Sequence, residues 1–501
     1  MLAAGRKSYL RSSSAVLLGS VAGQVVFLAV SPLLTRRYPP AAFGVAGVFT
    51  AVLAMASTPA NGRYHLAIAI PESPLEARAL LRLSMWFTPP AAAAMGALFL
   101  GYLQLTGYGG GRDRLLAGTA MALAVALFGV AAAYQALLGR IDAFTDVGWS
   151  RAGQGVVNTV VSLGLGTAGS AGGLVAGQLA GQGAAGAVAG IGLWRLRRQW
   201  CVPGRMPLWP LARRYSSFPL LSTPAGVMNS LGVQAPVLLI PLLFSIQSTG
   251  IYALSYRMII APAAMLTMAL ATVFQGSAPD AHRDGRLLGE ITRIVNVMTR
   301  VALPLTVALV IAGPLVATVL FGDEWKGAGR LFQLLAPWFL VIIVVAPLSP
   351  TFTVLEQLRR DLVFQTSLVV SRVVAVLIGG LAGSFELGVA LSSAVTVAHY
   401  LVFLHLVARA LDGTVRRLLA PVVPVVVRST AAVAVALLAV WLLPGSATEI
   451  TPSGVAVIAV AALFVLSEAA LLARSTGVRG RRVAGPSPTR FPLVTADAAA
   501  D

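Results

Sequence analysis

The stretch Tyr215–Tyr256, YSSFPLLSTPAGVMNSLGVQAPVLLIPLLFSIQSTGIYALSY, decides the fold because it runs for about forty residues without a charged side chain. A helix needs about 20 predominantly apolar residues to cross the hydrocarbon core of a bilayer. The stretch is therefore long enough for two crossings, and its Pro and Gly residues mark the turn between them. It predicts a helical hairpin inside a membrane.

Uncharged apolar runs of this kind recur along the whole chain. A second run of about forty residues separates Arg151 from Arg195. Shorter runs are Leu83–Gly111, Leu115–Gln135, Val301–Gly322, Leu331–Leu355 and Ser429–Thr448. Only 11% of the residues are charged and the mean hydropathy is +0.82, whereas a soluble domain carries about 25% charged residues.

Hydropathy predicts an all-α polytopic membrane protein with about 14 transmembrane helices. The spans fall near residues 14–34, 42–60, 84–106, 115–138, 152–168, 172–194, 217–243, 249–275, 296–321, 329–354, 362–383, 386–408, 421–443 and 453–473. With this count, the termini and the even-numbered loops hold 27 Arg and Lys residues, whereas the odd-numbered loops hold six. Positive residues accumulate on the cytoplasmic side of membrane proteins, so we expect both termini in the cytoplasm.

The composition and motifs exclude several functional classes. The net charge of +19 comes from short loops between spans, so it indicates membrane topology rather than a nucleic-acid partner. Cys201 is the single cysteine, which leaves no disulfide framework and no thiolate metal site. The sequence has no phosphate-binding G-x-x-x-x-G-K-[ST] loop, no H-E-x-x-H and no G-x-S-x-G motif. It predicts no cofactor, no metal and no ATP-driven pump.

The chain divides into two similar halves. The segment 27–49, FLAVSPLLTRRYPPAAFGVAGVF, resembles 236–257, PVLLIPLLFSIQSTGIYALSYR: each has Pro-Leu-Leu near a helix end, a short turn, and an aromatic residue or Thr before Gly. Such internal repeats are common in transporters. The expected organisation is a six-helix lobe at 1–194, a basic cytoplasmic linker at 195–216, a second six-helix lobe at 217–410, an accessory helix pair at 411–473 and a disordered tail at 474–501.

Two further patterns concern helix packing. Gly169, Gly173, Gly177 and Gly181 repeat every four residues, with Gly186 and Gly190 beyond them, which predicts a seam of close contact between helices. From 286 to 298 the apolar residues fall on one helix face and Arg286, Glu290 and Arg293 on the other. This pattern predicts a helix lying at the cytoplasmic membrane surface.

Four cations remain inside or at the ends of spans: Arg257, Arg300, Arg372 and Arg428. A guanidinium in hydrocarbon costs several kcal/mol, so such residues normally face a wet cavity or a partner. Arg300 and Arg428 lie near helix ends, where they can reach the interface, while Arg257 and Arg372 lie deeper and Arg63 follows the second span. Acidic residues near spans are scarce (Glu356, Glu386 and Glu468). The interior is therefore expected to be cationic and to suit an anionic cargo such as a pyrophosphate.

Four segments also resemble a known family. They are SPLLTRRYPPAAFGVAGVF at 31–49, NGRYHLAIAIPESPLEARALLRLS at 61–84, FPLLSTPAGVMNSLGVQAPVLLIPLLFSIQSTGIYALSYRMIIAPAAML at 218–266 and LFGDEWKGAGRLFQLLAPWFLVIIVVAPLS at 320–349. In this order they are similar to the polysaccharide and O-antigen flippases of the multidrug/oligosaccharidyl-lipid/polysaccharide exporter superfamily. The resemblance carries over Arg63, in the R-Y-x-x-A-I stretch, and Arg257, in the A-L-x-Y-R stretch. No acidic residue lies in the first two spans, so no coupling carboxylate of the kind some relatives use is identified.

The resemblance implies two six-helix lobes around a central cavity, often with two added C-terminal helices. It also implies transport of undecaprenyl-pyrophosphate-linked oligosaccharide across a bacterial cytoplasmic membrane by alternating access, without any enzymatic step. We expect Arg63, Arg257, Arg300 and Arg372 to contact the substrate. Expected partners are the lipid-linked oligosaccharide, membrane lipids, and a polysaccharide polymerase and glycosyltransferases. The alternatives are a multidrug exporter of the same superfamily and an integral-membrane polymerase or glycosyltransferase.

Overall fold

A computed structural model describes residues 2–166, 169–355, 357–442, 459–468 and 470. Within these residues the chain forms helices joined by short turns, and no strand. Ten helices are long and apolar enough to cross a membrane, and three shorter apolar helices, Pro40–Ala56, Val423–Val435 and Ala459–Glu468, accompany them. The prediction of an all-α multi-pass membrane protein is confirmed, while the count of fourteen spans and the side of each terminus stay predictions.

Local sequence signals set the starts of several helices. Pro40 occupies the first turn of α2 (Pro40–Ala56), where its missing N–H costs nothing. Ser73 accepts a hydrogen bond from the Glu76 N–H at the start of α4 (Pro74–Leu105). Ser245 and Ser384 cap α11 (Ile246–Arg283) and α16 (Phe385–Ala410) in the same way. Each side-chain oxygen satisfies an N–H group that the first turn leaves without a helical partner.

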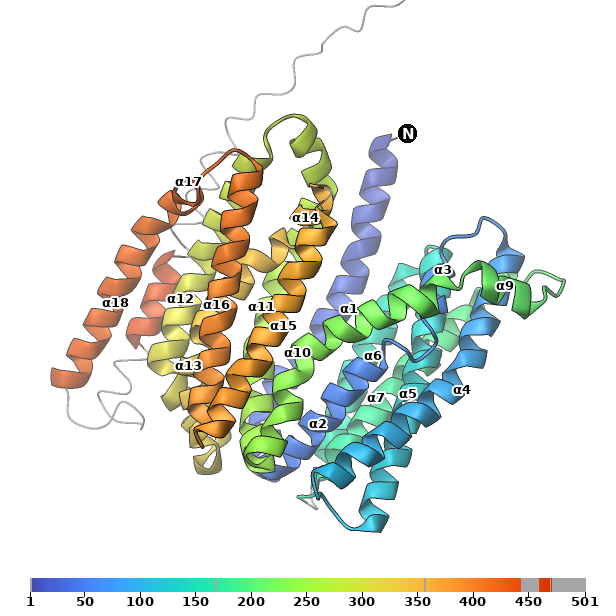
Figure 1. Ribbon diagram of the computed structural model, residues 1–501, viewed down its shortest axis with the longest axis horizontal. Coiled ribbons are helices and arrows are strands. Elements are labelled where there is room, and N and C mark those ends of the chain that lie inside the picture. Colours follow the sequence, from blue (N-terminus) through green and yellow to red (C-terminus); the bar gives the residue numbers. More distant parts are fainter. Residues whose placement is uncertain (1, 167–168, 356, 443–458, 469, 471–501) are drawn as a thin grey trace, which may run out of the picture.

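The helices before residue 196 form one group, at the right of Figure 1. Besides α2 and α4 it contains α1 (Leu2–Arg37), the short α3 (Tyr64–Ala67), α5 (Gly111–Arg140), α6 (Phe144–Gly164) and α7 (Ala171–Arg195). Helix α6 packs against α1 and α7, and α5 packs against α4 and α7.

The helices after residue 222 form a second group, at the left and centre of Figure 1. It comprises α10 (Thr223–Leu243), α11, α12 (Leu287–Phe321), η3 (Asp323–Trp325), α13 (Lys326–Val345), η4 (Ala346–Leu348), α14 (Thr351–Val354), α15 (Leu358–Leu381) and α16. Helix α2 joins the two groups because it packs against both α10 and α11. The assignment of these groups as two transport lobes stays a prediction.

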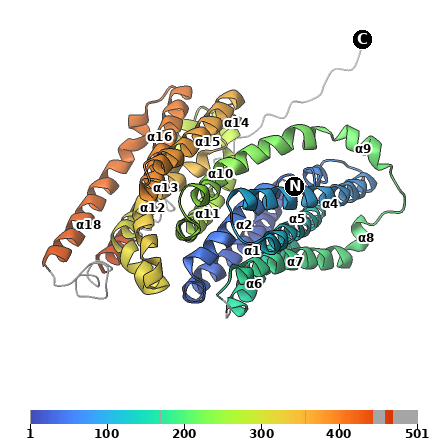
Figure 2. The same ribbon diagram turned by 60° about the horizontal axis from the view of Figure 1, so that its bottom comes forward.

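The basic segment between the groups is held on the first of them. It contains α8 (Arg197–Trp200), α9 (Leu208–Arg214) and the π-helix η2 (Phe218–Ser222), which wrap around the outside of the bundle in Figure 2. Glu76 of α4 is buried and accepts hydrogen bonds from Arg214 Nη1 and the Tyr215 hydroxyl, both at 3.0 Å. Burial, together with this hydrogen bond to the Glu76 carboxylate, raises the pKa of Tyr215 above its usual value.

The C-terminal helices pack on the outside of the second group. Helix α17 (Val415–Leu419), η5 (Ala420–Val422) and α18 (Val423–Leu442) contact α12. Both oxygens of buried Glu468 pair with the Arg428 guanidinium, the Nη2–Oε2 distance being 3.0 Å. Arg428 thus forms an ion pair within the protein, in addition to any extension of its side chain toward the membrane surface. The predicted tail at 474–501 and Glu356 lie outside the described residues.

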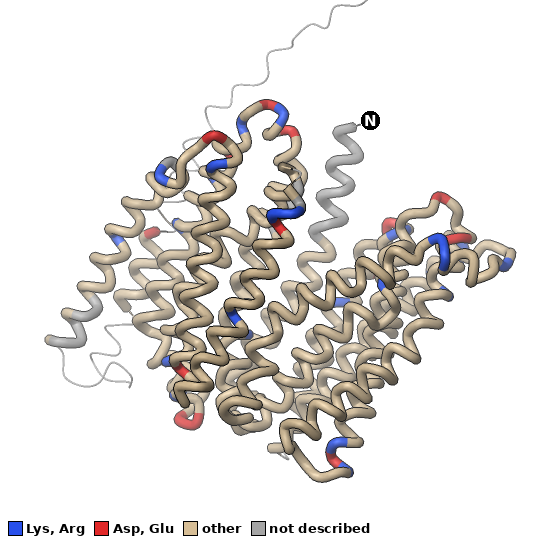
Figure 3. The backbone as a smooth tube through the Cα atoms, in the orientation of Figure 1, with Lys and Arg blue, Asp and Glu red and all other residues tan. Residues whose placement is uncertain are grey.

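Basic residues gather at one end of the bundle, as Figure 3 shows. We call this the basic end. Helices α3, α9, α14 and α17 lie at this end in Figure 1, whereas the opposite end carries fewer basic segments, which lie beside acidic ones. This distribution follows the charge asymmetry of the sequence.

The predicted glycine seam lies mainly along α7. A Cβ at Gly177 would stand 2.0 Å from Ser162 Oγ, and one at Gly181 would stand 2.7 Å from the Gln154 carbonyl oxygen, both on α6. A Cβ at Gly173 would stand 2.1 Å from the Tyr38 hydroxyl. The prediction of close helix packing is confirmed for these three residues.

We expect Gly177→Val to destabilise the protein by about 1–3 kcal/mol, because the added atoms force α6 and α7 apart. The measurement is thermal unfolding of the purified protein in detergent. Gly172→Ala on the same helix is the control, because its Cβ meets only Ser170 Oγ at 3.5 Å, an ordinary contact distance. Equal melting temperatures for the two variants would contradict the seam.

Candidate functional site

A polar cavity lies between α1, α2, α3, α5, α6, α7, α10 and α11. It consists of two adjoining hollows of about 650 and 470 Å³. Residues that line both hollows are Gln24, Phe27, Thr50, Asn158, Gln178, Arg257 and Ala261. We call the two hollows together the central cavity. Its size is that of a small-molecule binding site.

Arg257 projects from α11 into the central cavity. It lies eleven residues after the first residue of α11, about 17 Å along the helix and so near the middle of a bilayer of about 30 Å. Its guanidinium carbon stands 3.4 Å from the centre of the Phe27 ring of α1. This cation–π contact directs the guanidinium into the cavity, where it is exposed although it lies deep within the bundle.

Arg151 lines the same cavity, although the hydropathy pattern did not predict it there. Its charge marked a loop before a span expected at 152, but α6 begins at Phe144, so Arg151 lies in its second turn. Its Nη1 donates to Ser20 Oγ of α1 at 3.2 Å. Arg151, Gln154, Asn158 and Ser162 are three or four residues apart and so share one helix face. This polar spacing is the signal that identifies a cavity-facing helix.

The rest of the polar lining consists of amides, hydroxyls and an imidazole. These groups are Ser20, Gln24, Thr50, His65, Gln135, Gln154, Asn158, Ser162, Gln178, Gln182, Gln234 and Tyr256. Among the described residues that line the cavity, none is Asp or Glu. The cavity is therefore cationic, with amides that can both donate and accept hydrogen bonds.

Arg63 lies just beyond the cavity, at its basic end. It is one of the few non-glycine residues with positive φ (56°), and its Nη1 donates to the backbone oxygen of Ser222 at 3.1 Å and to Ser222 Oγ at 2.8 Å. Its guanidinium also rests on Gly226, where a Cβ would stand 2.5 Å from Nη2. Arg63 thus connects the segment after α2 to the start of α10.

His65 follows two residues later and lines the cavity. It lies outside the candidate spans, and its Nδ1 is 2.5 Å from the side-chain oxygen of buried Asn61. Burial, assisted by the positive charge of Arg63, lowers the pKa of His65 to about 4. The imidazole is therefore neutral at physiological pH and does not add a cation to the cavity.

We expect acid to destabilise the protein through His65. Its pKa is lower in the folded protein than in the unfolded chain, so the unfolded chain binds the proton more tightly. The free energy of unfolding therefore has its full value above pH 6.5 and decreases as the pH falls toward 4. Between pH 7 and pH 5 the loss is about 2 kcal/mol. Thermal unfolding should show a larger acid-induced fall in Tm for the wild type than for His65→Gln. An equal fall in both proteins would contradict the assignment.

The central cavity is closed at the end opposite His65, where α2 meets α11. The Phe43 ring packs edge-on against Trp325, with ring centres 5.0 Å apart. Trp325 is fully buried and its Nε1 donates to the Thr35 carbonyl oxygen at 3.2 Å. Tyr38, also buried, donates from its hydroxyl to the Ser162 carbonyl oxygen at 2.6 Å.

The sequence matches a family of known proteins over residues 33–330, more than half of the chain. The family is described as "Polysaccharide biosynthesis protein". The chain belongs to this family. No curated protein sequence is a significant match.

Two solved structures are similar to this polysaccharide biosynthesis protein. The first is a lipid II flippase, MurJ, in an inward closed conformation: the TM-score is 0.69 at 10% identity, covering 93% of this chain and 99% of that one. The second is an inward-facing multidrug resistance MATE family transporter of the MOP superfamily, with a TM-score of 0.55 at 13% identity, covering 78% of this chain and 94% of that one. The protein therefore has the fold of membrane flippases and transporters.

The family match contains three of the four arginines predicted to bind substrate: Arg63, Arg257 and Arg300. Arg300 lies on α12, where its Nε donates to Asn296 Oδ1 at 3.1 Å, and it is not among the described residues that line the central cavity.

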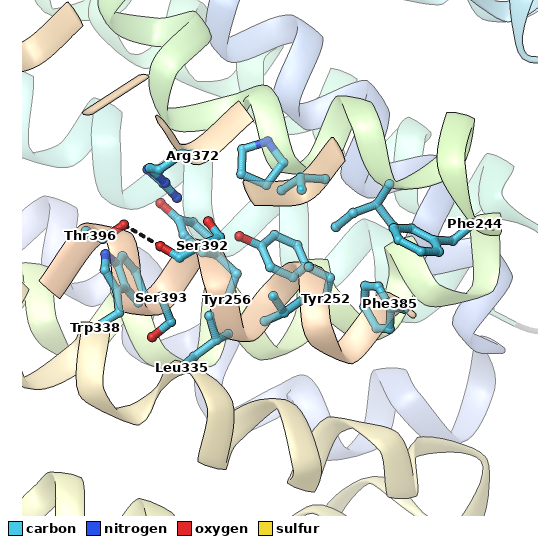
Figure 4. Close-up of a pocket in the computed structure, with 15 residues that line it drawn as sticks. Phe244, Tyr252, Tyr256, Leu335, Trp338, Arg372, Phe385, Ser392, Ser393 and Thr396 are labelled. Atoms are coloured by element: carbon cyan, nitrogen blue, oxygen red, sulfur yellow. Dashed lines mark hydrogen bonds between the residues drawn. The ribbon is translucent and has the colours of Figure 1, made fainter. Parts of the chain in front are cut away.

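Arg372 of α15 lies in a separate pocket of the second helix group, shown in Figure 4. Its volume of about 10 Å³ is too small for a pyrophosphate. Of the four, the structure thus places only Arg257 in the central cavity, and contact of the others with substrate stays a prediction.

Proposed function

We propose that this protein flips undecaprenyl-pyrophosphate-linked oligosaccharide across the bacterial cytoplasmic membrane during synthesis of a surface polysaccharide such as O-antigen or exopolysaccharide. The observation that carries the proposal is a central cavity with two arginines, many amides and no carboxylate among its described lining residues. Guanidinium groups bind phosphate oxygens in a bidentate manner. Amide side chains suit sugar hydroxyls, which also both donate and accept.

The two arginines lie at different depths, which suggests an order of contact. Arg151 is in the second turn of α6, near the basic end, whereas Arg257 lies about 17 Å along α11 from its start at the opposite end. With the basic end in the cytoplasm, the pyrophosphate meets Arg151 first and Arg257 next, while the polyprenyl chain stays in lipid. Rocking of the two helix groups then opens the cavity to the other side. No covalent bond is made or broken.

A multidrug exporter is the second candidate, because the fold is also that of a MATE family transporter. Cationic drugs would favour carboxylates in the binding site. The central cavity offers none among the residues that the structure describes and presents Arg257 instead. This charge favours the anionic lipid-linked cargo.

Reconstitution into liposomes tests the proposal directly. The vesicles contain a fluorescently labelled undecaprenyl-pyrophosphate oligosaccharide, and an impermeant quencher added outside reports the fraction of label on each leaflet. We expect protein-dependent exchange of this lipid and no exchange of a labelled, uncharged polyprenol-linked sugar. Exchange of neither lipid, together with uptake of a cationic dye, would favour the exporter. Co-purification with a polymerase or glycosyltransferases would test the proposed partners.

A further inference from the structure

The small pocket in the second helix group has the features of a separate binding site. It is enclosed by α10, α11, α13, α15 and α16, and its lining includes Tyr252, Tyr256, Trp338, Arg372 and Ser393. Its volume of about 10 Å³ is the space that one water-sized particle needs. Figure 4 shows the Arg372 guanidinium directed into this group of side chains.

Arg372 brings a buried positive charge that the surrounding residues do not neutralise. The side chain is 9% exposed. The guanidinium hydrogen-bonds with the Tyr252 hydroxyl, Nη1 makes one long hydrogen bond, 3.4 Å, to the Gly232 carbonyl oxygen, and Nε has no partner among the described residues. The described residues that line the pocket include no Asp or Glu. A buried charge of this kind is normally paired, because leaving it alone is costly.

The other polar groups in the pocket are hydroxyls, and they can donate hydrogen bonds. Ser393 Oγ also has no partner in the described part of the chain, but in Figure 4 it points away from Arg372. The hydroxyl-bearing ends of Tyr252 and Tyr256 lie near Arg372 in Figure 4. The Tyr256 ring is held by stacking on Trp338, with centres 5.3 Å apart. A guanidinium with surrounding hydroxyl donors and no carboxylate is a site for an anion.

We propose that this pocket binds one monovalent anion of the size of chloride between Arg372 and the neighbouring hydroxyls. The site differs from the central cavity in size and in its arginine, and Tyr256 lines both. The anion neutralises Arg372 and fixes the packing of α10, α15 and α16 around it. The proposal does not depend on the cargo of the transporter.

Thermal unfolding of the purified full-length protein tests the site. Wild-type protein is compared in sodium chloride, sodium bromide and sodium gluconate at equal ionic strength. We expect chloride and bromide to raise Tm by several degrees over gluconate, with a saturable concentration dependence. Tyr252→Phe, which removes one donor beside Arg372, should weaken chloride binding about tenfold, and Arg372→Gln should abolish the chloride effect. Arg257→Gln is the control and should keep it.

A crystallographic measurement covers the case in which Arg372→Gln fails to fold. Wild-type crystals grown in bromide should give an anomalous peak beside Arg372, whereas a peak only beside Arg257 would overturn the proposal. Equal stability in chloride and gluconate would also overturn it, since the pocket would then hold a water molecule. Loss of the chloride effect in Arg257→Gln alone would assign the effect to the central cavity and overturn the proposal as well.

Discussion

Replacing Arg257 with alanine should weaken binding of the lipid-linked oligosaccharide by at least about 30-fold and reduce transport correspondingly. Removing one partner of a buried charge pair costs about 2–5 kcal/mol, and each 1.4 kcal/mol is tenfold in affinity. The guanidinium stands in the central cavity against Phe27, 3.4 Å from the ring centre, with no lining carboxylate among the described residues. Binding to protein in detergent and exchange in liposomes measure the two effects.

Two substitutions separate the charge of Arg257 from its shape. Arg257→Lys keeps the charge but loses the planar fork and its stacking, so we expect an intermediate loss. Phe27→Leu removes the cation–π contact, worth about 0.5–2 kcal/mol, and should weaken binding less than Arg257→Ala. Arg293→Ala is the matched control, because Arg293 is exposed near the start of α12. Full transport by correctly inserted Arg257→Ala would contradict the assignment of the cavity.

The sequence predicted the helices better than it predicted the cavity. Apolar runs locate spanning helices because the bilayer demands them. The same logic assigned Arg151 to a loop, since a charge normally marks the end of a span. In the structure, however, a charged residue can also lie within a helix if that helix faces a polar cavity. Arg151 of α6 is such a residue. The signal for this cavity face was the spacing of polar residues three or four positions apart on α6. Averaging hydropathy over a window removes this signal.

Which of Arg257, Arg300 and Arg372 faces the cavity could not be read from the sequence, for a related reason. Lipid and the interior of a membrane protein are equally apolar. Hydropathy therefore does not show which face of a helix contacts lipid and which face contacts the rest of the protein. The amphipathic segment at 286–298 shows this. The sequence placed it on the membrane surface, whereas in the structure it is the first part of α12, with Leu287, Ile291 and Val295 buried in the protein core.

The two halves of the internal repeat meet at the closed end of the central cavity. Gly44 of α2 and Gly250 of α11 occupy matching positions in the repeat, each in the first turns of its helix. A Cβ at Gly44 would stand 2.0 Å from the Ile246 carbonyl oxygen, and one at Gly250 would stand 1.7 Å from that of Pro40. Each glycine thus allows the start of the other helix to approach closely, and the contact is reciprocal.

Gly250→Val should therefore open the cavity at this end and reduce transport by at least about fivefold. Overpacking costs about 1–3 kcal/mol, which corresponds to about a 5- to 150-fold shift between closed and open states. The measurement uses Ala46→Cys, on the cavity lining of α2, in a Cys201→Ser background, because Cys201 is the sole cysteine. An impermeant thiol reagent added from the end opposite the basic end should react with Ala46→Cys much faster when Gly250→Val is present.

The matched control for this prediction is Gly101→Val on α4, where a Cβ meets nothing within 4 Å. It should leave both the labelling rate and transport close to those of the Ala46→Cys background. Gly44→Val should reproduce the effect of Gly250→Val, because the two contacts are reciprocal. A valine at either position would hold the ends of α2 and α11 apart. Slow labelling with normal transport in both variants would mean that closure depends instead on Trp325 and its contacts with Phe43 and Thr35.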